Sequence, residues 1–312
     1  MLRRSVLGAL GGLLALLAGC TADSRSEGIK HARELTVAVT TSTYDAGVLD
    51  PLHEAFEERF GVRVRTVAGG TGENLRTGER GDVDCVMAHA PPLEAAFLES
   101  GHGINRRNFV RGDFVIAGPA EDPAGISEGS SDPSGSRTAS GDDGVEDAAT
   151  AFARIAEREA TFVSRGDDSG THVQERAVWE AAGIDPDGEW YLETGQGMGD
   201  TLVAADRRDA YLLTVRGNYH RMRDRLALES FVEGPITGGD PSLDNPYGII
   251  AVNPAIHQDV DYQLAMSYIG FLTSPEGQVI VREHTVDGQR PFLPAALSEE
   301  PDFGQYRGGR DQ

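Results

Sequence analysis

The sequence predicts an α/β protein of two lobes, each with a mostly parallel sheet flanked by helices. Strand patterns alternate with helix patterns over residues 34–117, and the same alternation begins again at residue 148. Such alternation places successive strands in one parallel sheet whose loops open at the strand carboxyl ends. Between the two stretches, residues 121–147 are rich in Gly, Ser, Asp and Pro, which predicts a low-complexity surface insertion.

The first lobe is predicted to begin with a strand, because apolar residues alternate at positions 35, 37 and 39. A helix follows, with apolar residues four apart from Val48 to Phe60, and Gly61 ends it. Next come a strand at 62–66, a glycine turn and a further helix. The lobe continues with a strand at 85–88, a helix at 93–99 and a strand at 114–117.

The second lobe repeats this order. Helices are expected at 148–159, 172–182 and 199–208, and strands at 160–164, 190–193 and 211–214. A strand at 247–252 then returns, followed by a helical stretch at 262–282 that breaks at Ser274-Pro275. The expected boundaries are 34–117 and 246–297 for the first lobe, 118–245 for the second lobe and 298–312 for a C-terminal tail.

Composition narrows the class of protein. The 312 residues are 39% hydrophobic and 25% charged, which excludes collagen-like, coiled-coil and multi-span membrane proteins. The net charge is −22 and Lys30 is the sole lysine, so we expect no nucleic-acid partner. An acidic, lysine-poor chain of this kind is typical of proteins that work in concentrated salt, a halophilic composition.

The N-terminus has the pattern of an export signal. Residues 1–19 join Arg3-Arg4, which resembles a twin-arginine signal, to about twelve apolar residues, fewer than the roughly twenty that span a bilayer. Residues 17–20 resemble a lipobox, which predicts lipidation of Cys20 and a tether over residues 20–33. We expect an extracytoplasmic, lipid-anchored protein in which Cys85 has no disulfide partner and is buried.

Three turns between a strand and a helix are rich in hydrogen-bond donors: residues 40–43, 69–72 and 164–171. Each turn alone is explained by helix capping. Together they place hydroxyls, helix N-terminal N–H groups and Arg165 at strand ends of two lobes, which favours an oxyanion site.

These turns also carry a resemblance to a known family. The chain resembles the tungstate-binding lipoproteins of ABC transporters from about Leu35 to Phe292, outside the insertion. The matching segments are residues 40–45, 70–72, 113–116, 160–172, 188–191, 195–199, 245–248 and 273–278.

The resemblance implies a type II periplasmic-binding-protein fold, in which two lobes joined by crossover strands close on an oxyanion. It implies binding of tungstate or molybdate without a cofactor, and delivery by a monomer to the permease and ATPase of an ABC importer. The ligand-binding residues carried over by position are Thr41, Ser42, Thr71, Arg165, Ser169, Gly170 and Thr171. Val215 stands where the family is expected to have aspartate.

Other functions stay open on the residues alone. The segment 165–171 is also similar to phosphate-binding relatives, and a carboxylate at the ligand would favour hydrogen phosphate over fully ionised tungstate. We expect Asp167 and Asp168 instead to cap the next helix and orient Arg165. A sensory or adhesion module on the same fold is the other alternative.

An enzyme and a metal site are not expected. Ser169 and His172 lie within one turn and lack the Gly-x-Ser-x-Gly spacing of a nucleophile elbow. The eight histidines, among them His89 and His102, show no metal-ligand spacing and are expected to be structural or exposed.

Overall fold

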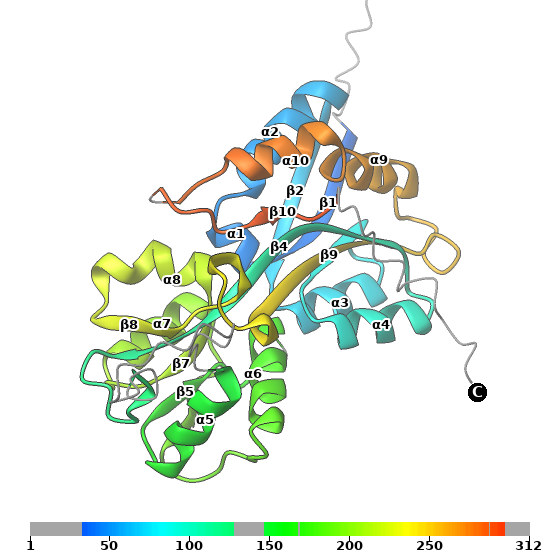
Figure 1. Ribbon diagram of the computed structural model, residues 1–312. Helices are drawn as coiled ribbons and strands as arrows, with labels where there is room; N and C mark the ends of the chain where they lie inside the picture. Colours follow the sequence, from blue (N-terminus) through cyan, green and yellow to red (C-terminus); the bar gives the residue numbers. More distant parts are fainter. Residues whose placement is uncertain (1–32, 128–146, 168, 287, 297–312) are drawn as a thin grey trace, which may run out of the picture. The chain divides into compact units, whose positions relative to one another are not determined.

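The computed structural model describes residues 33–127, 147–167, 169–286 and 288–296. The unit that begins at Arg33 has the predicted two-lobed α/β fold (Figure 1). The predictions for the leader, Cys20, most of the insertion, Asp168 and the C-terminal tail lie outside the described residues.

The first lobe is formed by two separate stretches of chain. The first stretch contains β1 (Arg33–Thr40), α1 (Thr41–Asp45), α2 (Leu49–Phe60), β2 (Val62–Gly69), α3 (Thr71–Glu79), β3 (Cys85–Ala88) and α4 (Pro91–Glu99). The second contains β9 (Asp244–Val252), α9 (Tyr262–Leu272), α10 (Pro275–Glu283) and β10 (Leu293–Pro294). Gly61, with φ +64°, ends α2 as predicted.

Strand β1 is buried on both of its faces. Leu35, Val37 and Val39 pack against α2, α9 and α10 in one core, and Ala38 faces a second core under α3 and α4. Alternate side chains of a strand point to opposite faces, so a central strand needs apolar residues at consecutive positions. Cys85 on β3 is a buried free thiol, as predicted.

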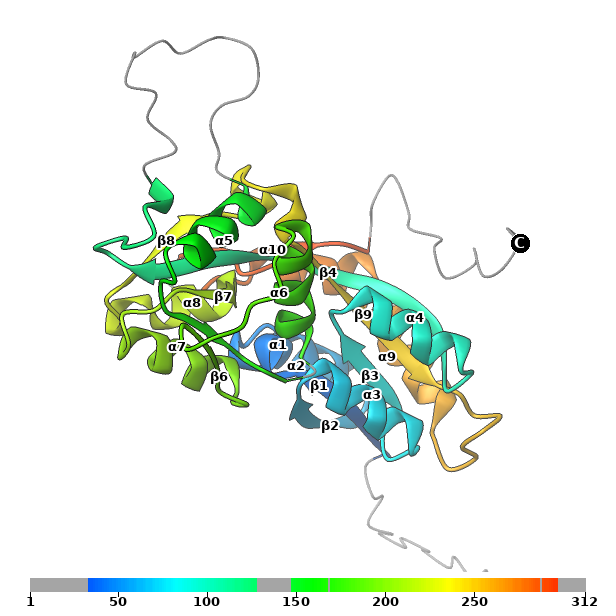
Figure 2. The ribbon, with the colours of Figure 1, turned by 90° about the horizontal axis from the view of Figure 1, so that it is seen from below.

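The second lobe follows the same plan with shorter strands. It contains α5 (Ala148–Glu157), β5 (Phe162–Ser164), α6 (Gly170–Ala181), β6 (Tyr191–Glu193), α7 (Met198–Asp206), β7 (Leu212–Val215), α8 (Arg216–Met222) and β8 (Leu228–Val232), with 3₁₀ turns at Arg223–Arg225, Pro235–Thr237 and Pro241–Leu243. Figure 2 shows helices α3 and α4 beside β3 and β9, away from α5, α7 and α8.

Strand β4 (Gly103–Pro119) belongs to both lobes. It pairs antiparallel with β9 as far as Asp113, and from Phe114 onward with β7 and β8. Phe114 and Ile116 face a core under α5 and α6, while Val115 and Ala117 face a core under α7 and α8. The change of partners therefore falls at Phe114, before the boundary expected at residue 117.

The sheets are parallel only within each repeating unit. Strands β1, β2 and β3 are parallel, as are β5 and β6. The pairs β3–β9, β4–β9, β4–β10, β4–β7 and β4–β8 are antiparallel, because β4 and β9 run between the lobes in opposite directions. The larger sheet is thus mixed, and β5 and β6 form a separate two-stranded parallel sheet. Strand β8, helix α8 and the first half of β4 are elements that the sequence pattern did not predict.

Candidate functional site

The turn between β1 and α1 presents two hydroxyls at the carboxyl end of a central strand. Thr40 caps α1, and its hydroxyl oxygen accepts a bond from the N–H of Thr43 (3.3 Å). Ser42 is 4% exposed, and its Oγ lies 3.1 Å from the Thr40 hydroxyl and 2.9 Å from the Tyr247 hydroxyl. Thr41 begins the helix and is partly exposed.

The turn between β2 and α3 adds one fully buried hydroxyl. Gly70 has the extended conformation of an N-cap, and Thr71 opens α3. The Thr71 hydroxyl oxygen accepts a bond from the backbone N–H of His89 (3.3 Å). Because a lone pair of this oxygen is already in use, the hydroxyl proton is the group left to bind an acceptor.

The turn between β5 and α6 places Arg165 in the interior, only 5% exposed. Its Nη2 donates to Asp167 (2.7 Å), and the other oxygen of this carboxylate accepts from the N–H of Ser169 (3.1 Å). Asp167 therefore orients Arg165, as predicted. The Arg165 Nε is buried and has no hydrogen-bond partner among the described residues. A buried N–H of a guanidinium is costly to leave unpaired, so this atom marks a place for an acceptor.

Helix α6 begins at the same point. Ser169 caps it, and the Ser169 hydroxyl oxygen accepts from the N–H of His172 (3.2 Å). Gly170 and Thr171 form the first turn, and both are buried. The N–H groups of a first helical turn have no partner within the helix and lie at its positive end, which favours an anion.

The space around two glycines shows that the turns of the two lobes lie against each other. A Cβ added to Gly70 would lie 3.7 Å from the Cα and Cβ of Ser169. A Cβ added to Gly170 would lie 2.6 Å from Cε1 and Nε2 of His89, so only glycine permits this approach. The structure thus brings Thr71, Ser169 and Gly170 together from two lobes.

Electrostatics links Arg165 and Ser42 to the same place. The charge of Arg165 contributes to lowering the pKa of His89 and opposes the rise in the pKa of Tyr247. Ser42 contacts this same tyrosine. Thr41 and Thr171 each lie next in sequence to a residue of the group, Ser42 and Gly170 respectively.

Sequence reasoning missed a buried polar cluster of His89, Asn245 and Tyr247. The His89 ring stacks on Tyr247 with centroids 4.7 Å apart and an interplanar angle of 4°. Burial, with the charge of Arg165, lowers the pKa of His89 to about 4, against a weaker opposing effect from Asn245, so the ring is neutral at neutral pH. The available signal was position, because His89 directly follows β3 at the edge where the other turns lie.

A second feature that the sequence did not predict is an ion-pair cluster where β4 passes between the lobes. Asp113 is fully buried and accepts from Arg216 Nε (2.6 Å) and Nη2 (2.8 Å), while Glu233 pairs with Nη1 of the same guanidinium. Val215, in the position expected to hold an aspartate, lies in the apolar core under α5 and α6. Arg216 is therefore supported by Asp113 and Glu233 instead.

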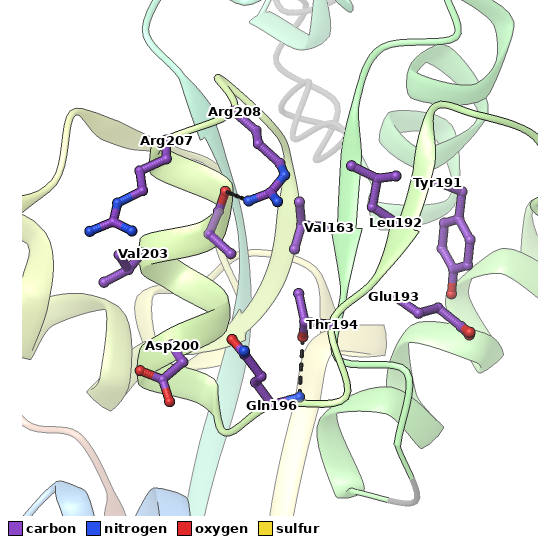
Figure 3. A pocket seen from close by; sticks show the side chains of 11 residues that line it. Val163, Tyr191, Leu192, Glu193, Thr194, Gln196, Asp200, Val203, Arg207 and Arg208 are labelled. Carbon is purple, nitrogen blue, oxygen red and sulfur yellow. Dashed lines mark hydrogen bonds between the residues drawn. The ribbon is translucent and has the colours of Figure 1, made fainter.

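A separate pocket of about 760 Å³ lies between β6 and α7 (Figure 3). It is lined by Val163, Tyr191, Leu192, Glu193, Thr194, Gln196, Asp200, Val203, Ala204, Arg207 and Arg208. None of the predicted site residues lines it. Its polar walls are exposed and carry carboxylates beside the arginines, so it lacks the buried donors that an oxyanion requires.

Within the part of the chain that the structure describes, no group of His, Cys, Asp and Glu side chains could hold a metal ion. None of the described helices is both long and apolar enough to cross a membrane.

Comparison with known proteins decides the family. Residues 25–276 match the PBP superfamily domain, more than half of the chain. The chain belongs to the PBP superfamily. This PBP protein is 34% identical over 284 residues to the tungstate-binding protein TupA of Peptoclostridium acidaminophilum, covering 90% of this chain and 93% of that one.

Two further relatives of the PBP protein agree with this assignment. A Haloferax volcanii protein with the provisional name ABC transporter anion-binding protein is 48% identical over 320 residues, covering 97% of this chain and 89% of its own. The structure of the tungstate ABC transporter from Geobacter sulfurreducens superposes with a TM-score of 0.67 and 43% identity, covering 80% of this chain and 98% of that one. The predicted fold and the resemblance to tungstate-binding proteins of ABC transporters are confirmed.

Proposed function

We propose that this PBP protein captures tungstate, and molybdate with it, between its two lobes and delivers the anion to an ABC importer. The observation that carries the proposal is the buried Arg165 Nε, which has no partner among the described residues, in a turn that also carries the buried Ser169 and Thr171. A tetrahedral dianion supplies acceptor oxygens for both the guanidinium and the hydroxyls.

The ligand-binding residues in this proposal are the seven expected from the sequence. The first lobe contributes Thr41, Ser42 and Thr71, and the second contributes the segment from Arg165 to Thr171 with its Asp167 support. Because donors on both lobes reach one anion only when the lobes are together, the anion favours the closed state. That closed state is the form a permease would recognise.

The position of Asp167 favours a fully ionised ligand over hydrogen phosphate. Its two oxygens already accept from Arg165 and from the N–H of Ser169. Hydrogen phosphate carries a proton that needs an acceptor, and a carboxylate already occupied in this way is not free to supply one.

Titration calorimetry of the purified protein in high salt tests the function, with tungstate, molybdate, sulfate and phosphate added in turn. Tight binding of tungstate with no heat from phosphate is the expected result. Binding of phosphate alone would refute the proposal and move the protein to the phosphate-type alternative, and no binding of any of the four would refute an oxyanion ligand.

Cellular placement is part of the same proposal. We propose export through the twin-arginine signal, lipidation of Cys20 and action as a monomer beside the permease. Cys20→Ser is expected to release the protein from the membrane fraction into the medium, and retention of the variant in that fraction would contradict the anchor.

A further inference from the structure

Three buried hydroxyls of the site each have a hydrogen-bonding neighbour that the proposed function does not require by itself. Thr71 accepts from the N–H of His89 and Ser169 from the N–H of His172, while Ser42 lies 2.9 Å from the hydroxyl of Tyr247. A hydroxyl that already accepts has its single proton free to donate. For Thr71 and Ser169 a backbone N–H fixes this role, because an amide cannot accept.

Ser42 differs because its neighbour, the Tyr247 hydroxyl, can either donate or accept. A series of hydrogen-bonded side chains behind Tyr247 determines which of the two hydroxyls donates this hydrogen bond. His89 Nδ1 lies 2.9 Å from Asn245 Oδ1, Asn245 Nδ2 lies 3.1 Å from the Tyr247 hydroxyl, and that hydroxyl lies 2.9 Å from Ser42 Oγ. Since Tyr247 accepts from the Asn245 amide, its own proton points to Ser42.

The free end of His89 supports the same direction. The Nε2 end of its ring lies against the start of α6, since a Cβ added to Gly170 would lie 2.6 Å from both Cε1 and Nε2, and Arg165 lies within electrostatic reach. The positive end of a helix and a guanidinium both disfavour a proton on the ring nitrogen nearest to them, whereas a lone pair on that nitrogen is favoured. The proton of the neutral ring is therefore on Nδ1, from which it is donated to Asn245 Oδ1.

The hydrogen bond from Ser42 to Thr40 supports the same direction. Ser42 donates its single proton to the Thr40 hydroxyl (3.1 Å), so the bond between Ser42 and Tyr247 has to be donated by Tyr247. An oxyanion in the site would replace Thr40 as the acceptor of this proton.

We propose that His89, Asn245 and Tyr247 are positioning residues that make Ser42 a hydrogen-bond donor and so select a fully ionised oxyanion over a protonated one. The inference rests on the proposed function for the identity of the ligand. If the series ran in the opposite direction, Ser42 would donate to Tyr247 and turn a lone pair toward the ligand, which is the arrangement that hydrogen phosphate prefers.

The direction of the series can be measured without any ligand. Nitrogen-15 spectra of the protein labelled at histidine distinguish the two tautomers of each ring, and loss of the resonances in His89→Asn assigns them. The expected result is a protonated Nδ1 and a bare Nε2 for His89. A proton on Nε2 overturns the proposal whether or not tungstate binds.

A double-mutant cycle tests the action through Ser42. Tyr247→Phe is expected to weaken tungstate binding about tenfold, the effect of one hydrogen bond to a charged group. Because the tyrosine acts only through the serine, the same change is expected to have no effect in a Ser42→Ala background. Tyr219→Phe is the matched control, since it removes a buried hydroxyl that donates to the backbone of Leu228 in the second lobe.

The ratio of tungstate to phosphate dissociation constants separates positioning from damage to the fold. Tyr247→Phe is expected to raise the tungstate dissociation constant about tenfold relative to the phosphate dissociation constant. General loosening of the site would instead weaken the binding of both anions equally and leave the ratio unchanged. An unchanged ratio, or an equal loss in the Ser42→Ala background, overturns the inference. Failure of the wild-type protein to bind tungstate would instead refute the proposed function, and the tautomer measurement would still decide the direction of the series.

Discussion

Replacing Arg165 by alanine is the most informative perturbation of the site. The guanidinium is 5% exposed, is held by Asp167 through one Nη and leaves its Nε unpaired among the described residues. Removing one partner of a desolvated charge pair costs about 2–5 kcal/mol of binding free energy. At 1.4 kcal/mol per factor of ten, tungstate affinity is expected to fall from about thirtyfold to several thousandfold.

The fold is expected to survive this change. Asp167 keeps its bond from the N–H of Ser169, and its side chain is 29% exposed, so water can replace the guanidinium. The free energy of unfolding is therefore expected to change by less than about 1 kcal/mol. Arg165→Lys keeps the charge but loses the planar fork, and its affinity is expected to lie between those of the wild type and the alanine variant.

The assay is titration calorimetry with tungstate, accompanied by thermal unfolding of each variant. Arg207→Ala is the matched control, because it changes the net charge equally at an exposed position in the separate pocket. Its affinity is expected to stay within about twofold of the wild type. Near-normal affinity in Arg165→Ala would refute the site, and equal losses in both variants would assign the effect to net charge alone.

Three further predictions test lobe contact, pH dependence and the ion-pair cluster. Gly170→Ala is expected to weaken tungstate binding at least tenfold in calorimetry, because its methyl group would overlap the facing imidazole, whereas Gly197→Ala, with open space around its Cβ, is expected to be neutral. Burial raises the pKa of Glu175 to about 7 from 4.5. The unfolded chain therefore releases this proton between pH 4.5 and 7 while the folded chain keeps it, so the contribution of Glu175 to stability falls as pH rises. Chemical unfolding is expected to show Glu175→Gln on the order of 3 kcal/mol more stable than the wild type at pH 8 and equal to it near pH 4.5; equal stability at both would contradict the shift. Asp113→Asn is expected to cost about 3 kcal/mol of unfolding free energy, because it leaves a buried guanidinium without its main partner, against less than about 1 kcal/mol for Arg33→Gln at an exposed ion pair; similar costs would contradict a buried role.

Local patterns predicted most elements because their information lies within a few residues. The alternation at 35, 37 and 39 and the four-residue spacing up to Phe60 became β1 and α2, and the break at Ser274-Pro275 separates α9 from α10. The first half of β4 was missed because Asn105, Arg106, Arg107 and Asn108 interrupt any apolar alternation. Their strand conformation depends on pairing with β9, more than one hundred residues later, which no local pattern shows.

The site shows the same division between local and distant information. The hydroxyls and Arg165 stand in turns that can be recognised within eight residues of sequence. The roles of His89, Asn245 and Tyr247 depend on three segments that meet only in the folded chain, and a lone histidine gives no indication of such partners. The support of Arg216 by Asp113 is equally distant, across 103 positions.

The acidic chain and its anion site act over different distances. A net charge of −22 repels a dianion at long range, but in 1 M salt the screening length is only about 3 Å, so this repulsion disappears beyond contact. The buried guanidinium and hydroxyls act at hydrogen-bond distance, where solvent ions have little access. In such salt the abundant competitor is chloride, a spherical ion that has no separate oxygen atoms to match donors of fixed direction. On the proposed function, selection of a tetrahedral dianion therefore depends on the number and direction of donors rather than on accumulated positive charge, which explains how a lysine-poor chain can use one arginine at its site.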